Sequence, residues 1–312
     1  MCDFFLSVKM AILLSRNDYG VVHAVEEAIF PALFFKRLFG YRLVYDMDSS
    51  MVEQILGQYA LSRIFEKPMN FCEKLAVRRA DLVLPVSTGL SLRVAAYAPG
   101  KRQCVLHDVP FVSDTNGERM PEPLRKQLGI SGLLTLYVGN LEPYQGIDLL
   151  LQALNFIPAG TDLHLVVIGG DKAMVRHYRS AAATMKIDIP IDFIGPRPTK
   201  FLSAYLGQAD ILLSPRLWGL NTPMKVYSYM ASGKPILATD IPAHNQVLDT
   251  SCAVLVEPEP KEMAAGLMQL VRNPSHGRRI GKTAQTIVAK RYSVQAYKKK
   301  LITAYTTLKS SI

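Results

Sequence analysis

The residues of this sequence best suited to chemistry are a lysine and its neighbours at the start of a predicted helix. The stretch "NTPMKVYSYMASG" places Asn221, Thr222 and Pro223 just before Lys225. Asn or Thr ahead of a proline is typical of a helix start, and Gly233 of a helix end. The first turn of such a helix carries free N–H groups and the positive end of the helix dipole, so with Lys225 it predicts a site for an anionic phosphate. The alternative is a capped helix whose lysine is simply solvated.

Glycines at the ends of two further predicted strands add candidate contacts for the same ligand. Gly139 follows the run "LLTLYV", and Gly169 follows "LHLVVI". A glycine lets a ligand approach the backbone closely, and the helix expected to start near Gly146 directs its amino terminus toward the same place. Ligands of open α/β sheets bind beyond the carboxyl ends of the strands, so these features predict one shared site.

The elements that position these residues are short apolar runs alternating with helical stretches, a pattern typical of βαβ units and parallel sheets. The runs are almost wholly apolar, as strands covered by helices on both faces are. The first half of the chain opens with a helix-like stretch, "FFLSVKMAILLSRND", instead of a strand. Strands are predicted in two series, the first starting at Val21, Arg42, Asp81 and Cys104 and the second at Leu133, Leu163, Ile191, Asp210, Pro235 and Cys252.

A segment rich in Pro, Gly and charge, residues 110–132, separates the two series and is the expected linker. We predict an α/β protein with two Rossmann-like domains, doubly wound around parallel sheets, at residues 1–115 and 116–312. The first domain is expected to be incomplete. An amphipathic helix at residues 293–309 is expected to close the second domain. A length of 312 residues suits two such domains.

Composition narrows the functional classes. The chain is 49% hydrophobic and 20% charged, which is typical of a soluble globular protein. Its apolar runs are shorter than the roughly 20 residues of a membrane-spanning helix, and no secretory signal pattern opens the chain, so a cytoplasmic location is predicted. The four cysteines are too widely spaced for a metal or redox motif. A net charge of +10 predicts an anionic partner, but scattered basic residues and the lack of a reading module argue against nucleic acid.

Several of these segments together resemble a known family. "YVGNLEPYQGIDLLLQAL", "VVIGG", "DILLSPR" and "NTPMKVYSYMASGKPILATD" are similar to the carboxyl-terminal domain of family 4 glycosyltransferases, and "VVHAVEEA", "YRLVYDMDSS" and "RADLVLPVS" to its amino-terminal domain. The resemblance implies the GT-B architecture, two domains facing a cleft, and transfer of a sugar from a nucleotide-diphosphate donor with retention of anomeric configuration. It implies a UDP- or GDP-sugar donor and a glycan, lipid-linked or small-molecule acceptor, as in cell-envelope or polysaccharide biosynthesis. No metal or other cofactor is expected, because fixed positive charge stabilises the leaving diphosphate.

The resemblance also implies roles for individual residues. Lys225, with the helix start at Asn221 and Thr222, would neutralise the donor diphosphate. Arg216, which follows the strand before this helix, would add positive charge. Pro196 lies where relatives bind the nucleobase, but its identity does not distinguish uridine from guanosine.

The sequence departs from the family pattern around this site. Asn140 and Gln145 stand where the family usually has an arginine and a lysine directed at the diphosphate. Leu220 and Ser228 stand where many relatives have two glutamates, the second of which contacts the donor ribose. Ser228 is still able to hydrogen-bond a hydroxyl. We interpret these differences as substitutions within a variant of the family.

In the first half, Asp48 stands where the family has an active-site histidine. A carboxylate accepts a hydrogen bond from a sugar hydroxyl but donates one only when protonated. His23 and the pair Glu26 and Glu27 are further candidates, with the alternative that the glutamates only complement a helix dipole. The resemblance begins inside the family's first domain, so we expect an amino-terminally truncated chain with weak transferase activity.

Two other functions remain open: a nucleotide-sugar epimerase of the same architecture, and a catalytically silent donor-binding subunit. A second open question concerns residues 26–43, which combine an apolar face with Lys36, Arg37 and Arg42. This segment predicts either a helix that rests on an anionic membrane surface, which would make the protein peripheral to a membrane, or a core helix with a cationic end.

Overall fold

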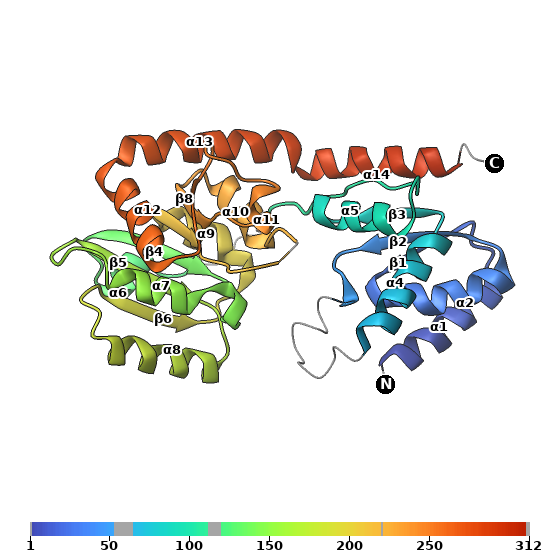
Figure 1. Cartoon of the computed structure of the whole chain (residues 1–312), viewed down its shortest axis with the longest axis horizontal. Helices are drawn as coiled ribbons and strands as arrows, with labels where there is room; N and C mark the ends of the chain where they lie inside the picture. Colours follow the sequence, from blue (N-terminus) through green and yellow to red (C-terminus); the bar gives the residue numbers. More distant parts are fainter. Residues whose placement is uncertain (1, 53–64, 112–119, 220, 310–312) are drawn as a thin grey trace. The chain divides into compact units, whose positions relative to one another are not determined.

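The chain folds into two compact units (Figure 1). Unit 1 comprises Met1–Asp108 and Gln295–Ile312, and unit 2 comprises Val109–Val294. The boundary predicted near residue 115 falls outside the described residues. The computed structural model describes residues 2–52, 65–111, 120–219 and 221–309.

Unit 1 is built on a parallel sheet of three strands in the order β1-β2-β3. The helix predicted at the start of the chain is confirmed as α1. The helices and strands of unit 1 are α1 (Cys2–Arg16), β1 (Val21–Val25), the 3-10 helix η1 (Glu26–Ala28), α2 (Ile29–Phe39), β2 (Arg42–Met47), α4 (Glu66–Arg79), β3 (Leu82–Pro85), α5 (Thr88–Tyr97) and α14 (Val294–Lys309).

The sheet of unit 1 is covered on both faces. Leu43 and Met47 of β2 belong to a core that also contains residues of α2, α4 and α5. Val44, on the opposite face of the same strand, packs in a second cluster with Leu308 of α14. Tyr297, Leu301 and Tyr305 pack against this cluster too, so the predicted apolar face of the closing helix is confirmed. That face covers the sheet of unit 1, whereas the helix was expected to close the second domain.

The strand predicted from Cys104 is wrong, because this segment makes only an isolated bridge between Gln103 and Val83. Val83 donates to the Arg102 carbonyl at 3.1 Å and accepts from the Cys104 amide at 3.1 Å, as in a parallel ladder. The next ladder bond would need an N–H from Pro85, which has none. The second step therefore keeps only one of its two bonds, from the Leu106 amide to the Pro85 carbonyl at 2.9 Å, and is too incomplete to count as a strand.

Unit 2 is a doubly wound domain with a parallel sheet of six strands in the order β6-β5-β4-β7-β8-β9. All six strands of the second predicted series are confirmed. The elements of unit 2 are α6 (Leu124–Leu128), β4 (Leu133–Val138), the 3-10 helix η3 (Pro143–Gln145), α7 (Ile147–Leu154), β5 (Leu163–Ile168), α8 (Lys172–Met185), β6 (Ile191–Gly195), the 3-10 helix η4 (Thr199–Phe201), α9 (Leu202–Gln208), β7 (Ile211–Ser214), α10 (Met224–Ser232), β8 (Ile236–Thr239), α11 (Pro242–Asn245), β9 (Val254–Val256), α12 (Pro260–Arg272) and α13 (Pro274–Arg291).

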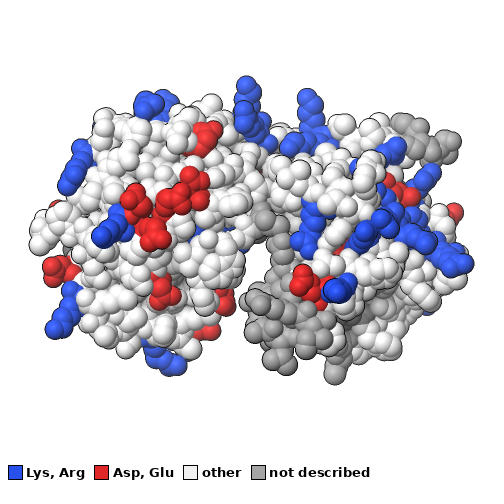
Figure 2. Space-filling model, in the orientation of Figure 1, with Lys and Arg blue, Asp and Glu red and all other residues white. Residues whose placement is uncertain are grey.

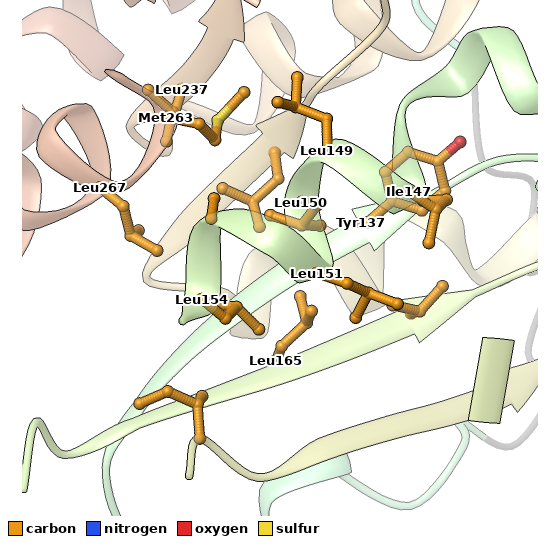
Figure 3. Packing of buried hydrophobic residues seen from close by; sticks show 14 of the residues in the cluster. Tyr137, Ile147, Leu149, Leu150, Leu151, Leu154, Leu165, Leu237, Met263 and Leu267 are labelled. Carbon is orange, nitrogen blue, oxygen red and sulfur yellow. The ribbon is translucent and has the colours of Figure 1, made fainter. Parts of the chain in front are cut away.

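Both faces of this sheet are buried, which explains why its strands are apolar at consecutive positions. Leu165 of β5 belongs to the cluster on one face, together with residues of α7, α8 and α12 (Figure 3). Val166, the next residue, belongs to the cluster on the other face, with residues of α9, α10 and α13. Tyr137 of β4 is fully buried in the first cluster. It lies close to the carboxyl end of β4, where the sequence predicts that the ligand binds. The sheet thus holds β4, β7 and the start of α10 in a fixed arrangement.

Candidate functional site

Helix α10 begins just beyond the end of β7 and is bounded by two backbone signals. Pro223 is its N-cap residue, and Gly233, with φ of 71°, is its C-cap. The predicted end is therefore confirmed. The predicted start was one residue too early: Pro223 has extended backbone, and the Val226 amide bonds to its carbonyl at 2.9 Å. Thr222 makes no capping bond. Its Oγ1 is buried and has no hydrogen-bond partner among the described residues.

Lys225, in the first turn of α10, extends its side-chain nitrogen over the end of β4. Its Nζ donates to Gln145 Oε1 at 2.9 Å and lies 3.9 Å from the centroid of the Tyr137 ring. Burial, and after it the positive charge of Arg216, lowers the pKa of Lys225 well below its usual value. The hydroxyl of Tyr137 donates to the carbonyl of Asn140 at 2.6 Å. This bond holds the loop after β4 against the tyrosine that contacts Lys225.

The two predicted glycines lie where any side chain would obstruct this arrangement. A Cβ atom on Gly139 would be 2.9 Å from the Tyr137 hydroxyl oxygen and 3.2 Å from Lys225 Nζ. A Cβ atom on Gly169 would be 1.9 Å from the carbonyl oxygen of Gly139. The ends of β4 and β5 thus meet through bare backbone beside the lysine. The helix expected near Gly146 is confirmed, because α7 begins at Ile147 with Gly146 as its N-cap.

Arg216 supplies a second basic side chain close to Lys225. Its Nε donates to the carbonyl of Trp218 at 2.8 Å, and its guanidinium carbon lies 5.1 Å from the centroid of the Tyr144 ring. Burial lowers the pKa of Arg216, while Tyr144 and Tyr137 oppose that shift. The basic side chains of Lys225 and Arg216 together form a site suited to a polyanion.

A buried polar network lies behind Arg216. The ring of His244 bonds to Ser214 Oγ at 2.8 Å through Nε2 and to the Thr239 carbonyl at 2.8 Å through Nδ1. The Thr239 hydroxyl donates in turn to the carbonyl of Arg216. Burial lowers the pKa of His244 to about 4, with Lys225 and Arg216 also acting in this direction, so its ring is neutral at ordinary pH. This network orients the backbone that carries Arg216.

The remaining candidates of unit 2 take different positions. Ser228 is buried, and its Oγ accepts the Phe111 amide at 3.0 Å, so one of its acceptor sites is already used. Asn221 lies beside Thr222 ahead of α10, and Pro196 is exposed just after β6. Leu220 lies outside the described residues. The structure thus brings together Lys225 and the groups around it. Gly195, the residue before Pro196, accepts a hydrogen bond from the Gly169 amide at 2.9 Å.

Unit 1 carries a separate group of carboxylates at the carboxyl ends of its strands. Glu26 follows β1, and its carboxylate accepts the single hydroxyl proton of Ser49, whose Oγ lies 3.0 Å from Oε1 and 2.9 Å from Oε2. Burial raises its pKa to about 7; Asp48 and Glu27 also raise it, and the bonds from Ser49 lower it. Glu26 has φ of 51°, a left-handed conformation that is rare outside glycine.

Asp48 is exposed just after β2. Desolvation by the protein around it and the charge of Asp46 raise its pKa, and His23 opposes them. His23 bonds to Asp46 Oδ2 at 2.9 Å and to the Tyr305 hydroxyl at 2.6 Å. Burial, followed by the charges of Asp48 and Asp46, raises the pKa of Asp108 to about 6. The group is therefore rich in acceptors and holds protons near neutral pH.

Sequence reasoning missed several of these residues. Asp108 lies inside the run predicted as a strand from Cys104, so its position gave no signal of a strand end. Tyr137 and His244 had no such signal, because an apolar strand or a short helix contains such residues for packing alone. Among the residues that the structure describes, no group of three or more His, Cys, Asp and Glu side chains has the arrangement of a metal site.

Comparisons with known proteins point in one direction. Residues 132–273, which include β4 to β9, match the model of a family described as glycosyl transferases group 1. Alpha-D-kanosaminyltransferase of Streptomyces kanamyceticus is 22% identical over 297 residues, which cover 90% of this chain and 76% of that protein. D-inositol 3-phosphate glycosyltransferase of Corynebacterium efficiens is 26% identical over 192 residues, 55% of this chain and 43% of that protein. The chain therefore matches less than half of the length of the second relative.

Solved structures agree on the fold. The sucrose-phosphate synthase of Thermosynechococcus elongatus superimposes with a TM-score of 0.82 at 17% identity, over 98% of this chain and 78% of that one. The Anabaena HepE protein in complex with UDP gives a TM-score of 0.79 at 16% identity, over 95% of this chain and 81% of that one. The chain thus has the GT-B fold, and its residues 132–273 match the model of the group 1 glycosyl transferases.

Proposed function

We propose that this protein transfers a sugar from a nucleotide-diphosphate donor to a hydroxyl acceptor, with retention of anomeric configuration. The observation that carries the proposal is the convergence of Lys225 and the first turn of α10 on bare backbone at Gly139. Cleavage of the sugar–phosphate bond leaves negative charge on the diphosphate, and preorganised cations and N–H groups lower the barrier to that cleavage. The HepE structures with UDP and UDP-glucose support a uridine donor, with a GDP-sugar as the alternative.

In this mechanism each group has a separate task. Lys225 and Arg216 hold the diphosphate and stabilise it as the leaving group. The unpartnered Thr222 Oγ1 is available to bond a phosphate oxygen. Glu26 and Asp48 of unit 1 orient acceptor hydroxyls through their carboxyl oxygens. The departing phosphate oxygen takes the acceptor proton, so no metal or protein nucleophile is required.

Thermal stabilisation by a panel of nucleoside diphosphates tests the donor site. We expect UDP or GDP to raise the melting temperature, and Lys225→Ala to remove most of that shift. Loss of one charged hydrogen bond costs about 1.5–3 kcal/mol, or about 10- to 150-fold in affinity. The matched control is Lys172→Ala, at an exposed position of α8, which should keep the shift. Equal shifts in all three proteins would remove Lys225 from the site.

Turnover assays separate the proposal from its two alternatives. A transferase forms product only when donor and acceptor are both present, and nuclear magnetic resonance of that product reports the anomeric configuration. An epimerase converts the donor with no acceptor, and a donor-binding subunit binds UDP without transferring sugar to any acceptor tested. Product with inverted configuration would contradict the retaining mechanism. We place the reaction in glycan or polysaccharide biosynthesis at the envelope, with a glycan or lipid-linked acceptor.

We further propose that unit 1 rests on an anionic membrane surface. Phe4 and Phe5 of α1 and Phe34 and Leu38 of α2 are all at least 64% exposed, and Figure 2 shows Lys and Arg side chains gathered on the face of unit 1 that it draws. Exposed aromatic and basic residues together favour the interface of an anionic bilayer. The part of the chain that the structure describes holds no helix long and apolar enough to cross a membrane.

Two of the three basic residues that the sequence predicted to contact the membrane already lie beside a carboxylate of the protein. Lys36 pairs with Asp81 at 2.7 Å, and Arg42 lies 3.7 Å from the same carboxylate. The proposal therefore depends on the apolar residues, with Arg37 as an exposed cation of α2. Sedimentation with vesicles of phosphatidylglycerol should remove the protein from solution, vesicles of phosphatidylcholine should do so less, and Phe34→Ser with Leu38→Ser should weaken the effect. Equal recovery with both lipids would exclude an electrostatic membrane role.

A further inference from the structure

The contacts of Lys225 in the unliganded protein show an amine that is held without a counter-charge. Its Nζ has the Gln145 amide oxygen at 2.9 Å and the Tyr137 ring face at 3.9 Å. Gln145 is itself only 7% exposed, and its Oε1 also lies 3.3 Å from the Tyr137 hydroxyl. None of the ion pairs among the described residues includes Lys225. An amide oxygen accepts a hydrogen bond from a neutral amine as well as from an ammonium.

Among the described residues, the charged or titratable groups found around this amine are cationic or neutral at ordinary pH. Arg216, after β7, repels a proton on Lys225. Burial is the main cause that lowers the pKa of His244 of α11 to about 4 and keeps its ring neutral. Tyr137 of β4 and Tyr229 of α10 are buried phenols whose pKa values are raised, mainly by that burial. The surroundings thus disfavour the ammonium form until an anion arrives.

We propose that a diphosphate binding at the start of α10 is accompanied by uptake of one proton at Lys225, which Gln145 and Tyr137 hold in position in the unliganded protein. This inference rests on the proposed donor site. The proton comes from solvent and forms an N–H bond with the lone pair of Nζ, and no bond of the ligand is broken. The new ammonium exchanges the Gln145 oxygen for a phosphate oxygen. Gln145 is therefore a positioning residue. Its contact with Lys225 explains how this chain binds the diphosphate with a glutamine at position 145, where the resembled family usually has a lysine.

Calorimetry of the full chain with UDP tests the coupling directly. Titrations in two buffers of different ionisation enthalpy, at matched values between about pH 7 and about pH 9, give the number of protons exchanged. UDP contributes little in this range, because its terminal phosphate ionises near pH 6. We expect uptake of up to about one proton and an affinity that falls by up to about tenfold per pH unit as the amine loses its proton in the free protein. Clear binding with equal heats in both buffers at every pH would overturn the coupling and leave the donor site intact.

Variants separate a positioning role from a structural one. In Gln145→Glu a carboxylate faces Nζ and keeps the lysine charged before UDP arrives, so proton uptake should fall close to zero while affinity weakens. Weaker binding with unchanged uptake would show that Gln145 only supports the fold. Gln152→Glu makes the same change at an exposed position of the neighbouring helix α7 and should behave like the unmodified chain. If no nucleoside diphosphate binds the unmodified chain, the proposed function fails and this inference fails with it.

Discussion

At the scale of single residues, the chemistry of this protein depends on charges that the fold keeps out of water. Lys225 and Gly139 could be predicted from the sequence near them. A lysine in the first turn of a helix adds to the positive end of the dipole, and a glycine at a strand end lets a ligand approach the backbone. Tyr137 could not, because its role comes from a lysine 88 positions away that only the folded chain places 3.9 Å from its ring. Residue identity therefore predicts the ligand class but not the group that holds the lysine.

Glu26 gives a residue-scale prediction about pH. Its pKa is raised from 4.5 to about 7, mainly by burial. The folded state therefore keeps a proton that the unfolded chain releases, and this contribution to stability is complete below about pH 4.5 and lost as the pH rises through about 7. Glu26→Gln cannot lose the proton, so its melting temperature relative to that of the unmodified chain should increase between about pH 5 and about pH 8.

A thermal denaturation series across that range checks the prediction. Glu27→Gln removes the same charge from an exposed neighbour and should give a smaller change with pH. The pKa of Asp108 is also raised, to about 6, so its contribution to stability falls with rising pH in the unmodified chain and in both variants. A constant difference between Glu26→Gln and the unmodified chain at all pH values would mean that Glu26 is not desolvated as described.

At the scale of elements, the sequence predicted the buried strands of unit 2 well and the edge pairing of unit 1 poorly. Strands buried on both faces are continuous apolar runs, which are easily recognised. The strand expected from Cys104 failed because Pro85 on the neighbouring strand has no N–H to continue the ladder. Helix starts were also less certain: Pro223 caps α10 with its own extended backbone, and Thr222 was left with an unpartnered hydroxyl.

The turn before α7 gives a prediction at this scale. Gly146 has φ of 76°, and a Cβ atom there would lie 1.8 Å from the carbonyl oxygen of Pro215. Gly146→Ala should therefore force η3 away from the end of β7 and lower the free energy of unfolding by about 2 kcal/mol or more. Gly207→Ala, inside α9 with no atom near its Cβ, should be neutral or stabilising by up to about 1 kcal/mol. Urea denaturation of both variants would compare them, and equal stabilities would refute this account of the turn.

At the scale of the whole molecule, the two compact units carry groups of opposite character. Unit 2 holds the basic side chains Lys225 and Arg216 at the end of its sheet, and unit 1 holds the carboxylates at the end of its own. This division follows from two parallel sheets, each of which presents the carboxyl ends of its strands to a ligand. The sequence predicted both sheets and both groups of residues. It assigned the closing helix to the wrong sheet, because an amphipathic pattern shows that one face of a helix is buried but not which sheet that face packs against.

The division predicts that donor binding and acceptor use respond to different residues. Asp48→Asn in unit 1 should leave UDP affinity within about twofold, because the groups proposed to hold the diphosphate all belong to unit 2. The same variant should slow sugar transfer and raise the KM for the acceptor. Calorimetry and steady-state kinetics on one preparation measure both effects. A large loss of UDP affinity with unchanged acceptor kinetics would reverse the assignment of the two units.

The most direct test of the central claim is a crystal structure of the chain with UDP. We predict diphosphate oxygens within hydrogen-bond distance of Lys225 Nζ and of the first backbone N–H groups of α10, with Gln145 released from the lysine. A diphosphate bound elsewhere, with the contact between Lys225 and Gln145 unchanged, would contradict the account.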